Sequence, residues 1–313
     1  MVIYQVHVDY NNGCGCKVMR NGVNFLPGYQ EFVKNTKLPL ESGRGLLCRN
    51  REGPGFENKA KRLKFTDLVD KLLNILKTFF MENAAIHGKK IAAGKAIEYI
   101  RNGMTLGLGT GSTAYWAIHG IGEQVKKGLS VRAIATSLQS ESLALDLGIP
   151  IVPFSEIDHL DITIDGADEV DEKLNLIKGG GGALLREKIV ASATRFYIII
   201  VDESKLVRWL GKFPLPVEVA PFGWELTSRR LEELGGHPRM RMAGTDPYLT
   251  DNQHYILDCS FGLIENPAQL HEQVSGITGV MEDGFFIDMA DIVIAGSPGG
   301  GTRVLERVTT TLR

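Results

Sequence analysis

The sequence predicts an α/β protein whose main domain is built on a parallel, Rossmann-like sheet with helices on both faces. Short runs such as residues 104–108 and 196–201 are apolar at nearly every position, as expected for strands that are buried on both faces. Segments with apolar residues at helical spacing alternate with these runs. A glycine-rich turn stands where one strand passes into the following helix, which is typical of an α/β chain.

The alternation can be followed in order from residue 81. In the first helix, Ala93, Ala96, Ile97 and Ile100 share one face, and Gly103 follows as a stop signal. The expected elements are then strand 104–108, helix 116–125, strand 131–136, helix 138–147, strands 149–153 and 161–164, helix 183–193 and strand 196–201.

Beyond residue 213 the pattern becomes that of a smaller α+β domain. The expected elements are helices 224–234 and 269–274, strands 254–258 and 285–287, and strand 292–295, which returns to the main sheet. We therefore expect a main domain at residues 81–213 plus 289–303, and a smaller domain at 214–288. Residues 299–313 are expected to form a loose tail.

Residues 1–80 read as a poorly structured basic extension, rich in Gly, Asn and Pro. Only residues 63–80 carry apolar side chains at the spacing of an amphipathic helix. This segment could be a partner- or membrane-binding arm, a cap packed on the rest of the chain, or the product of a mis-assigned start. We favour the last hypothesis, with Met81 as the natural first residue, because the regular pattern begins directly after it.

The composition gives no reason to expect nucleic acid or a membrane as a partner. The chain has 313 residues, is 43% hydrophobic and carries a formal net charge of −2. It contains no apolar stretch of about 18 residues and no secretory signal pattern at its start. Its four cysteines are too scattered for a disulfide framework, so we expect a reduced, cytoplasmic protein.

Residues 107–113, Gly-Leu-Gly-Thr-Gly-Ser-Thr, lie between an expected strand and a helix. Glycines let the backbone approach a ligand, and the free amides at a helix start attract an anion. A dinucleotide fingerprint would need Gly at Ser112, and a Walker loop would need Gly-Lys, so both interpretations fail. A phosphate-sized anion pocket is the favoured interpretation, and a tight turn without a ligand is the alternative.

Asp165, Asp168 and Glu169 follow the strand at 161–164, and ligands in open α/β sheets lie at such strand ends. These carboxylates could bind sugar hydroxyls, coordinate a hard cation such as Mg²⁺, or simply form a solvated acidic turn. Lys178 precedes four glycines, whose ordering is entropically costly and favours close approach to a substrate over a flexible linker. Lys178 could supply positive charge to a developing oxyanion. Glu187 suits a general base if water is excluded, although it could equally lie on a solvated helix face.

Taken together, these segments resemble the ribose-5-phosphate isomerase A family. The matching segments are GLGTGSTA (107–114), TIDGADEVD (163–171), LIKGGGGALLREKI (176–189), VDESKLV (201–207), LGKFPLPVEV (210–219), LEELGGHPRMR (231–241) and DNQHYILD (251–258). The resemblance runs in the family's order from about residue 82 to about residue 298. The first 80 residues have no family counterpart, and residues 299–313 diverge.

The resemblance implies a role for each matching residue. Glu187 would be the catalytic base, Asp165 and Asp168 would bind sugar hydroxyls and help open the ring, and Lys178 with the glycine amides would stabilise the enediolate. The remaining substrate-binding positions would be Lys89, Thr110, Gly111, Ser112, Thr113, Gly166, Ala167, Gly179, Gly180, Gly181 and Lys205. The family needs neither a metal nor a cofactor, so none is expected.

The implied activity is aldose–ketose isomerisation of ribose 5-phosphate to ribulose 5-phosphate, in the non-oxidative pentose phosphate pathway. The expected partner is this small sugar phosphate, and the expected assembly is a homodimer or homotetramer. Two alternatives are a sugar-phosphate sensor on the same fold and a related enzyme, either an aminosugar-phosphate isomerase or a coenzyme A transferase. The segment at 176–189 argues against both, because those families do not carry it.

Overall fold

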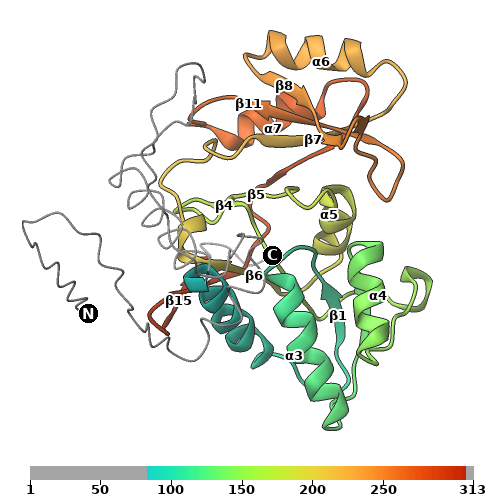
Figure 1. Ribbon diagram of the computed structural model, residues 1–313, viewed down its shortest axis with the longest axis vertical. Helices are drawn as coiled ribbons and strands as arrows, with labels where there is room; N and C mark the ends of the chain where they lie inside the picture. Colours follow the sequence, from blue (N-terminus) through green and yellow to red (C-terminus); the bar gives the residue numbers. More distant parts are fainter. Residues whose placement is uncertain (1–82, 308–313) are drawn as a thin grey trace, which may run out of the picture. The chain divides into compact units, whose positions relative to one another are not determined.

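The computed structural model describes residues 83–307, which are centred on a six-stranded sheet (Figure 1). The strand order is β15-β14-β6-β3-β1-β2; β15 is antiparallel to β14 at one edge, and the other neighbours are parallel. The strands are β1 (Thr105–Leu108), β2 (Arg132–Ala135), β3 (Ile162–Asp165), β6 (Tyr197–Asp202), β14 (Ile292–Gly296) and β15 (Thr302–Glu306). The predicted parallel-sheet core is confirmed.

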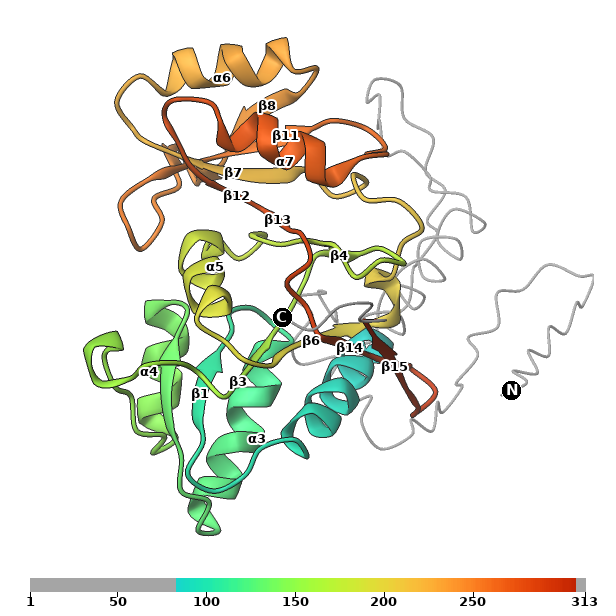
Figure 2. The same cartoon turned by 180° about the vertical axis from the view of Figure 1, so that it is seen from behind.

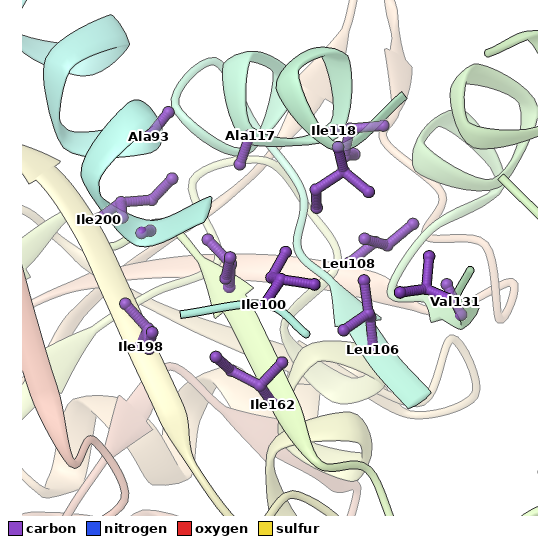
Figure 3. Close-up of a cluster of buried hydrophobic side chains, with 14 of the residues drawn as sticks. Ala93, Ile100, Leu106, Leu108, Ala117, Ile118, Val131, Ile162, Ile198 and Ile200 are labelled. Carbon is purple, nitrogen blue, oxygen red and sulfur yellow. The ribbon is translucent and has the colours of Figure 1, made fainter. Parts of the chain in front are cut away.

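Alternate residues of β6 supply two different cores, because successive side chains of a strand point to opposite faces. Ile198 and Ile200 pack with Ala93 of the helix at residues 83–97 and with Ile118 of α3 (Ala114–Lys126), as Figure 3 shows. Both helices therefore cover this face. The last α-helix before β3, α4 (Leu138–Asp146), packs against α3 and β2.

The opposite face is covered by one helix and a small sheet. Ile199 of β6 packs with Ala191 of α5 (Leu184–Ser192). The small antiparallel sheet has the order β13-β5-β4, and its strands are β13 (Phe285–Phe286), β5 (Leu176–Ile177) and β4 (Glu169–Val170). Helices therefore lie on both faces of the main sheet, as predicted, with α5 on this second face. The small sheet beside α5 was not predicted as a sheet.

Residues 215–283 form a second, four-stranded antiparallel sheet of order β12-β7-β11-β8. Its strands are β7 (Leu215–Val219), β8 (His237–Met240), β11 (Tyr255–Ser260) and β12 (Val280–Asp283). Helices α6 (Trp224–Glu233) and α7 (Pro267–Ser275) share an apolar core with Val217 and Leu257, so both cover one face of this sheet. On the other side, α5 and β4 lie between the two sheets (Figure 1 and Figure 2).

Two predicted elements are wrong. The expected loose tail contains β15, which pairs with β14 across a tight turn in which Ser297 N–H donates to Gly301 O at 2.8 Å. Its three glycines form a hairpin turn rather than ending the regular structure. The expected strand at 149–153 makes only one bridge, between Ile151 and Ala133, because Pro150 and Pro153 have no N–H to donate.

The interpretations of residues 1–80 lie outside the described residues. Between residues 83 and 307, no helix is both long and apolar enough to cross a membrane.

Candidate active site

The carboxyl ends of the parallel strands surround a cavity of about 250 Å³. From β1 the chain first adds β2 on one side and then β3 on the other, so the strand order reverses between β1 and β3. Ligands in open α/β sheets bind at such a switch point. The cavity is lined by Lys89, Thr110, Gly111, Ser112, Thr113, Gly166, Ala167, Asp168, Lys178, Gly179, Gly180, Gly181, Glu187 and Lys205. The structure thus brings every predicted site residue to one cavity except Asp165, which is fully buried. The cavity suits a small metabolite, being below the roughly 300–1,000 Å³ of sites for drug-sized ligands.

The loop after β1 turns sharply over Asp165. A side chain at Gly109 would have its Cβ 2.1 Å from Asp165 Oδ1, so only glycine fits there. Thr110 is held by a hydrogen bond of 2.8 Å to Ser137 Oγ. The amides of residues 111–113 make no hydrogen bond to the part of the chain that the structure describes, and they immediately precede α3. They are therefore free to bind an anion at the start of this helix.

Two further lysines bring positive charge to the cavity. Lys89 Nζ donates to Ser112 Oγ at 2.9 Å. The helix that carries Lys89 reaches the loop because Gly88 lies directly on Gly296 at the end of β14; a Cβ at Gly88 would be 2.6 Å from the Gly296 carbonyl oxygen. Lys205 lines the cavity from the 3₁₀ turn η2 (Glu203–Lys205), which follows β6.

Lys178, which also lines the cavity, forms a buried cluster with two carboxylates. Its Nζ lies 3.0 Å from Asp165 Oδ2 and 3.3 Å from Glu187 Oε2, and it donates to the carbonyl of Gly166. The exposed fractions are 2% for Lys178, 0% for Asp165 and 3% for Glu187. Burial lowers the pKa of Lys178, but the charges of Asp165 and Glu187 outweigh burial, so the net pKa is raised and the ammonium form is kept.

Glu187, on the first turn of α5, has the properties of a base that works near neutral pH. Burial raises its pKa to about 8, the Lys178 ammonium opposes this shift, and the Asp165 charge adds to it. Its Oε2 accepts no hydrogen bond from the described residues, although Lys178 Nζ is nearby. A carboxylate that is poorly stabilised and shielded from water accepts a proton readily.

Asp165 is fully occupied, whereas Asp168 faces the cavity. Asp165 Oδ1 accepts the amides of Gly166 at 2.7 Å and Thr110 at 3.2 Å, while Oδ2 faces Lys178. Asp168 Oδ2 accepts the Gly180 amide at 2.8 Å. A Cβ at Gly180 would lie 2.6 Å from the Asp168 carboxylate, so the glycine permits this contact.

Tyr197 also belongs to this cluster, although its sequence pattern did not predict it. Its hydroxyl donates to Asp165 Oδ2 at 3.2 Å, and burial followed by the Asp165 charge raises the pKa of Tyr197 well above its ordinary value. The only signal in the sequence was a tyrosine within an otherwise apolar strand. Such a tyrosine indicates a polar contact, because a buried tyrosine hydroxyl usually has a hydrogen-bond partner.

The donor set does not fit the Mg²⁺ interpretation of the acidic loop. The place beside Asp165 Oδ2 where a cation would bind is taken by the Lys178 ammonium. Within residues 83–307, metal-ligating side chains converge at His271, Glu282 and Asp283, away from the cavity. There Lys188 Nζ lies 2.7 Å from Glu282 Oε1, so this cluster also holds its own cation.

A doubly wound α/β fold with a polar cavity at the switch point is shared by many enzymes, so we compared the chain with known proteins. The family model described as ribose 5-phosphate isomerase A (phosphoriboisomerase A) matches residues 132–300. The ribose-5-phosphate isomerase A of Bacillus mycoides is 51% identical over 213 residues, covering 68% of this chain and 96% of the relative. That of Sphingopyxis alaskensis is 50% identical over 206 residues, covering 66% and 90%. This chain belongs to the ribose-5-phosphate isomerase A family.

Solved structures agree with this assignment. Ribose 5-phosphate isomerase A of Methanocaldococcus jannaschii is 40% identical with a TM-score of 0.67, covering 70% of this chain and 97% of that one. Ribose 5-phosphate isomerase of Plasmodium falciparum is 38% identical with a TM-score of 0.69, covering 71% and 98%. A D-ribose-5-phosphate isomerase in complex with phospho-erythronic acid is 42% identical with a TM-score of 0.68, covering 70% and 97%.

Proposed function

We propose that this protein interconverts D-ribose 5-phosphate and D-ribulose 5-phosphate through an enediolate, as a step of the non-oxidative pentose phosphate pathway. The carrying observation is that Glu187 and Lys178 lie buried in a cavity that is also lined by Lys89 and the free amides before α3. The ligand of the related structure, phospho-erythronic acid, has a planar carboxylate at one end and a phosphate at the other. An enediolate of a sugar phosphate likewise has a planar unit that carries two oxygens at one end and a phosphate at the other.

The phosphate would bind at the end formed by the loop after β1. Three free amides and the hydroxyls of Ser112 and Thr113 offer donors there, with Lys89 and Lys205 adding charge. Holding the phosphate at this end directs the open-chain C1–C2 unit toward Glu187.

Glu187 would transfer the proton. Its carboxylate takes the proton from C2 of the open-chain aldose while the C1 carbonyl becomes an enediolate oxygen. The same carboxyl group then returns the proton to C1, and the proton of the C2 hydroxyl passes to the C1 oxygen. The C2–O bond thereby becomes the ketone, and C1 carries the new hydroxyl. Nothing is gained or lost overall, so no oxidant or cofactor is needed. A well-placed base contributes about 10²–10⁴-fold.

Lys178 and the amides of the glycine loop would stabilise the enediolate oxygens. Lys178 keeps its proton because the charges of Asp165 and Glu187 raise its pKa by more than burial lowers it. In a water-excluded site, each such donor is worth about 10²–10³-fold in rate. Asp168, which lines the cavity, would bind a sugar hydroxyl and help to open the ring, while Asp165 would act mainly by holding Lys178.

We further propose that residues 214–288 act as a smaller α+β domain, that the chain assembles as a homodimer or homotetramer, and that it works in the cytoplasm. The four-stranded sheet with its own apolar core supports the first point. Exposed apolar side chains such as Phe222 and Leu263 offer surface for subunit contacts. Light scattering of the purified protein and fractionation of cells test the assembly and the location.

The test of the activity is formation of ribulose 5-phosphate from ribose 5-phosphate by the purified protein in the presence of EDTA. Turnover that resists the chelator and disappears in Glu187→Gln would support the reaction and the base. A protein that binds ribose 5-phosphate without converting it would instead be a sensor. Turnover only of an aminosugar phosphate, or transfer of coenzyme A, would indicate one of the related enzymes.

A further inference from the structure

We propose that Arg241, which directly follows β8 of the four-stranded sheet, is a positioning residue that fixes the peptide planes of the glycine loop for catalysis. This inference rests on the proposed isomerase activity. Arg241 does not line the cavity, so it acts through residues 179–181 and not on the substrate.

Arg241 holds two consecutive carbonyl groups of the loop. Its Nη1 donates to Gly179 O at 2.8 Å and to Gly180 O at 3.3 Å. In a planar trans peptide, the carbonyl and the next N–H point in opposite directions. The Gly180 amide therefore points away from Arg241, and it donates to Asp168 Oδ2.

By the same geometry, the Gly181 amide points away from Arg241. It makes no hydrogen bond to any residue between 83 and 307, and Gly181 lines the cavity. It is therefore a free donor for an enediolate oxygen. A flipped peptide would replace this donor with a carbonyl oxygen, which would repel the developing negative charge.

The guanidinium is itself held in place. Asp258 on β11 accepts Arg241 Nε at 3.0 Å and also pairs with Nη2, so the fork is bound along one edge and free to donate along the other. Leu257, the preceding residue of β11, faces the helix-covered core of the sheet. Because successive side chains of a strand point to opposite faces, Asp258 points to the other side, toward the loop.

Tyr248 supports the same loop from a second point. Its amide donates to Arg241 O at 2.8 Å, and its ring lies 6.0 Å from the Arg241 guanidinium carbon. A Cβ at Gly182 would be 2.3 Å from the Tyr248 hydroxyl. The segment that follows β8 thus contacts the loop through Arg241 and Tyr248, which gives this part of the chain a positioning role in catalysis.

The test compares Arg241→Ala and Arg241→Lys with Arg239→Ala. Arg239 lies on β8 two residues before Arg241, is exposed, and makes no hydrogen bond or ion pair with the loop in the described chain, so its removal controls for the loss of charge. We expect both Arg241 variants to lose about 10- to 100-fold in kcat with KM within about threefold, because the lost donor acts on the transition state. Arg239→Ala should keep the wild-type kcat.

Two further readouts separate positioning from a merely structural role. Inhibition by phospho-erythronic acid should weaken at least about tenfold in Arg241→Ala, in step with kcat, while inhibition by inorganic phosphate stays unchanged because the phosphate end is intact. Added guanidinium ion should restore part of the rate of Arg241→Ala. If Arg241→Ala does not fold, Arg241→Lys carries the same measurements.

Wild-type kcat in a folded Arg241 variant would overturn the inference, as would equal weakening of both inhibitors. An inactive wild-type protein would overturn the proposed function instead, so the two failures are distinct.

Discussion

Lys178 Nζ lies 3.3 Å from Glu187 Oε2, and the same ammonium lies 3.0 Å from Asp165 Oδ2. One buried cation thus faces two buried carboxyl groups, and only one of them is needed to balance its charge. Asp165 takes that role with four donors around it, so Glu187 is left as the group that gains and loses a proton. The first prediction follows from this division of roles.

The value of kcat/KM should rise with pH as Glu187 loses its proton, with a midpoint near the pKa of about 8 that burial imposes on it. The phosphate of the substrate titrates at about 6, so a limb near 8 belongs to the enzyme. The measurement is initial rate at low substrate concentration between pH 5 and 9.5. A value of kcat/KM that does not change above pH 6 would show that the raised pKa of Glu187 does not control catalysis.

Glu187→Gln should abolish most turnover, by about 10²–10⁴-fold, and leave substrate binding largely intact, because the amide keeps the shape but cannot take a proton. Kinetics together with calorimetric titration of ribose 5-phosphate check both parts. A near-normal rate in this variant would exclude Glu187 as the base.

The same substitution should change the pH dependence of stability. A carboxyl group whose pKa is 4.5 when unfolded and about 8 when folded binds protons more tightly in the folded state. Its stabilising contribution is therefore full below pH 4.5 and is lost as pH rises through about 8. Above pH 8, Glu187→Gln should unfold at a higher temperature than the wild type, and calorimetric melting at pH 6 and pH 9 would show whether the difference grows with pH.

Lys178→Ala should lower both kcat and substrate affinity, because the ammonium serves the bound substrate and the enediolate alike. It should also destabilise the fold, since Asp165 would keep a buried charge without its cation. Melting curves and steady-state kinetics of the folded fraction separate the two effects. A variant with wild-type KM would show that Lys178 acts only in the transition state.

The sequence predicted the cavity well because its residues are local to strand ends. Glycines after β1 and β5, and the carboxylates at and after the end of β3, are marked by composition and by position. The parallel sheet brings the ends of β1 and β3 to one edge. Arg241 and Tyr197 could not be found in this way. Arg241 reaches the glycine loop from a position just after β8 and more than 50 residues further along the chain, and Tyr197 is placed by the face of β6 on which it falls.

The last prediction concerns the close contact of Gly88 with Gly296, which brings Lys89 to the loop before α3. Gly88→Ala should raise KM for ribose 5-phosphate by about tenfold or more with a smaller effect on kcat, because the new methyl group would meet the Gly296 carbonyl and push the helix and Lys89 away. Gly94→Ala on the same helix is the matched control. Nothing lies within 4 Å of a Cβ at Gly94, so this change should leave KM unaltered and raise the melting temperature slightly, since alanine is favoured over glycine within helices. Equal KM values for the two variants would show that the Gly88 contact does not position Lys89.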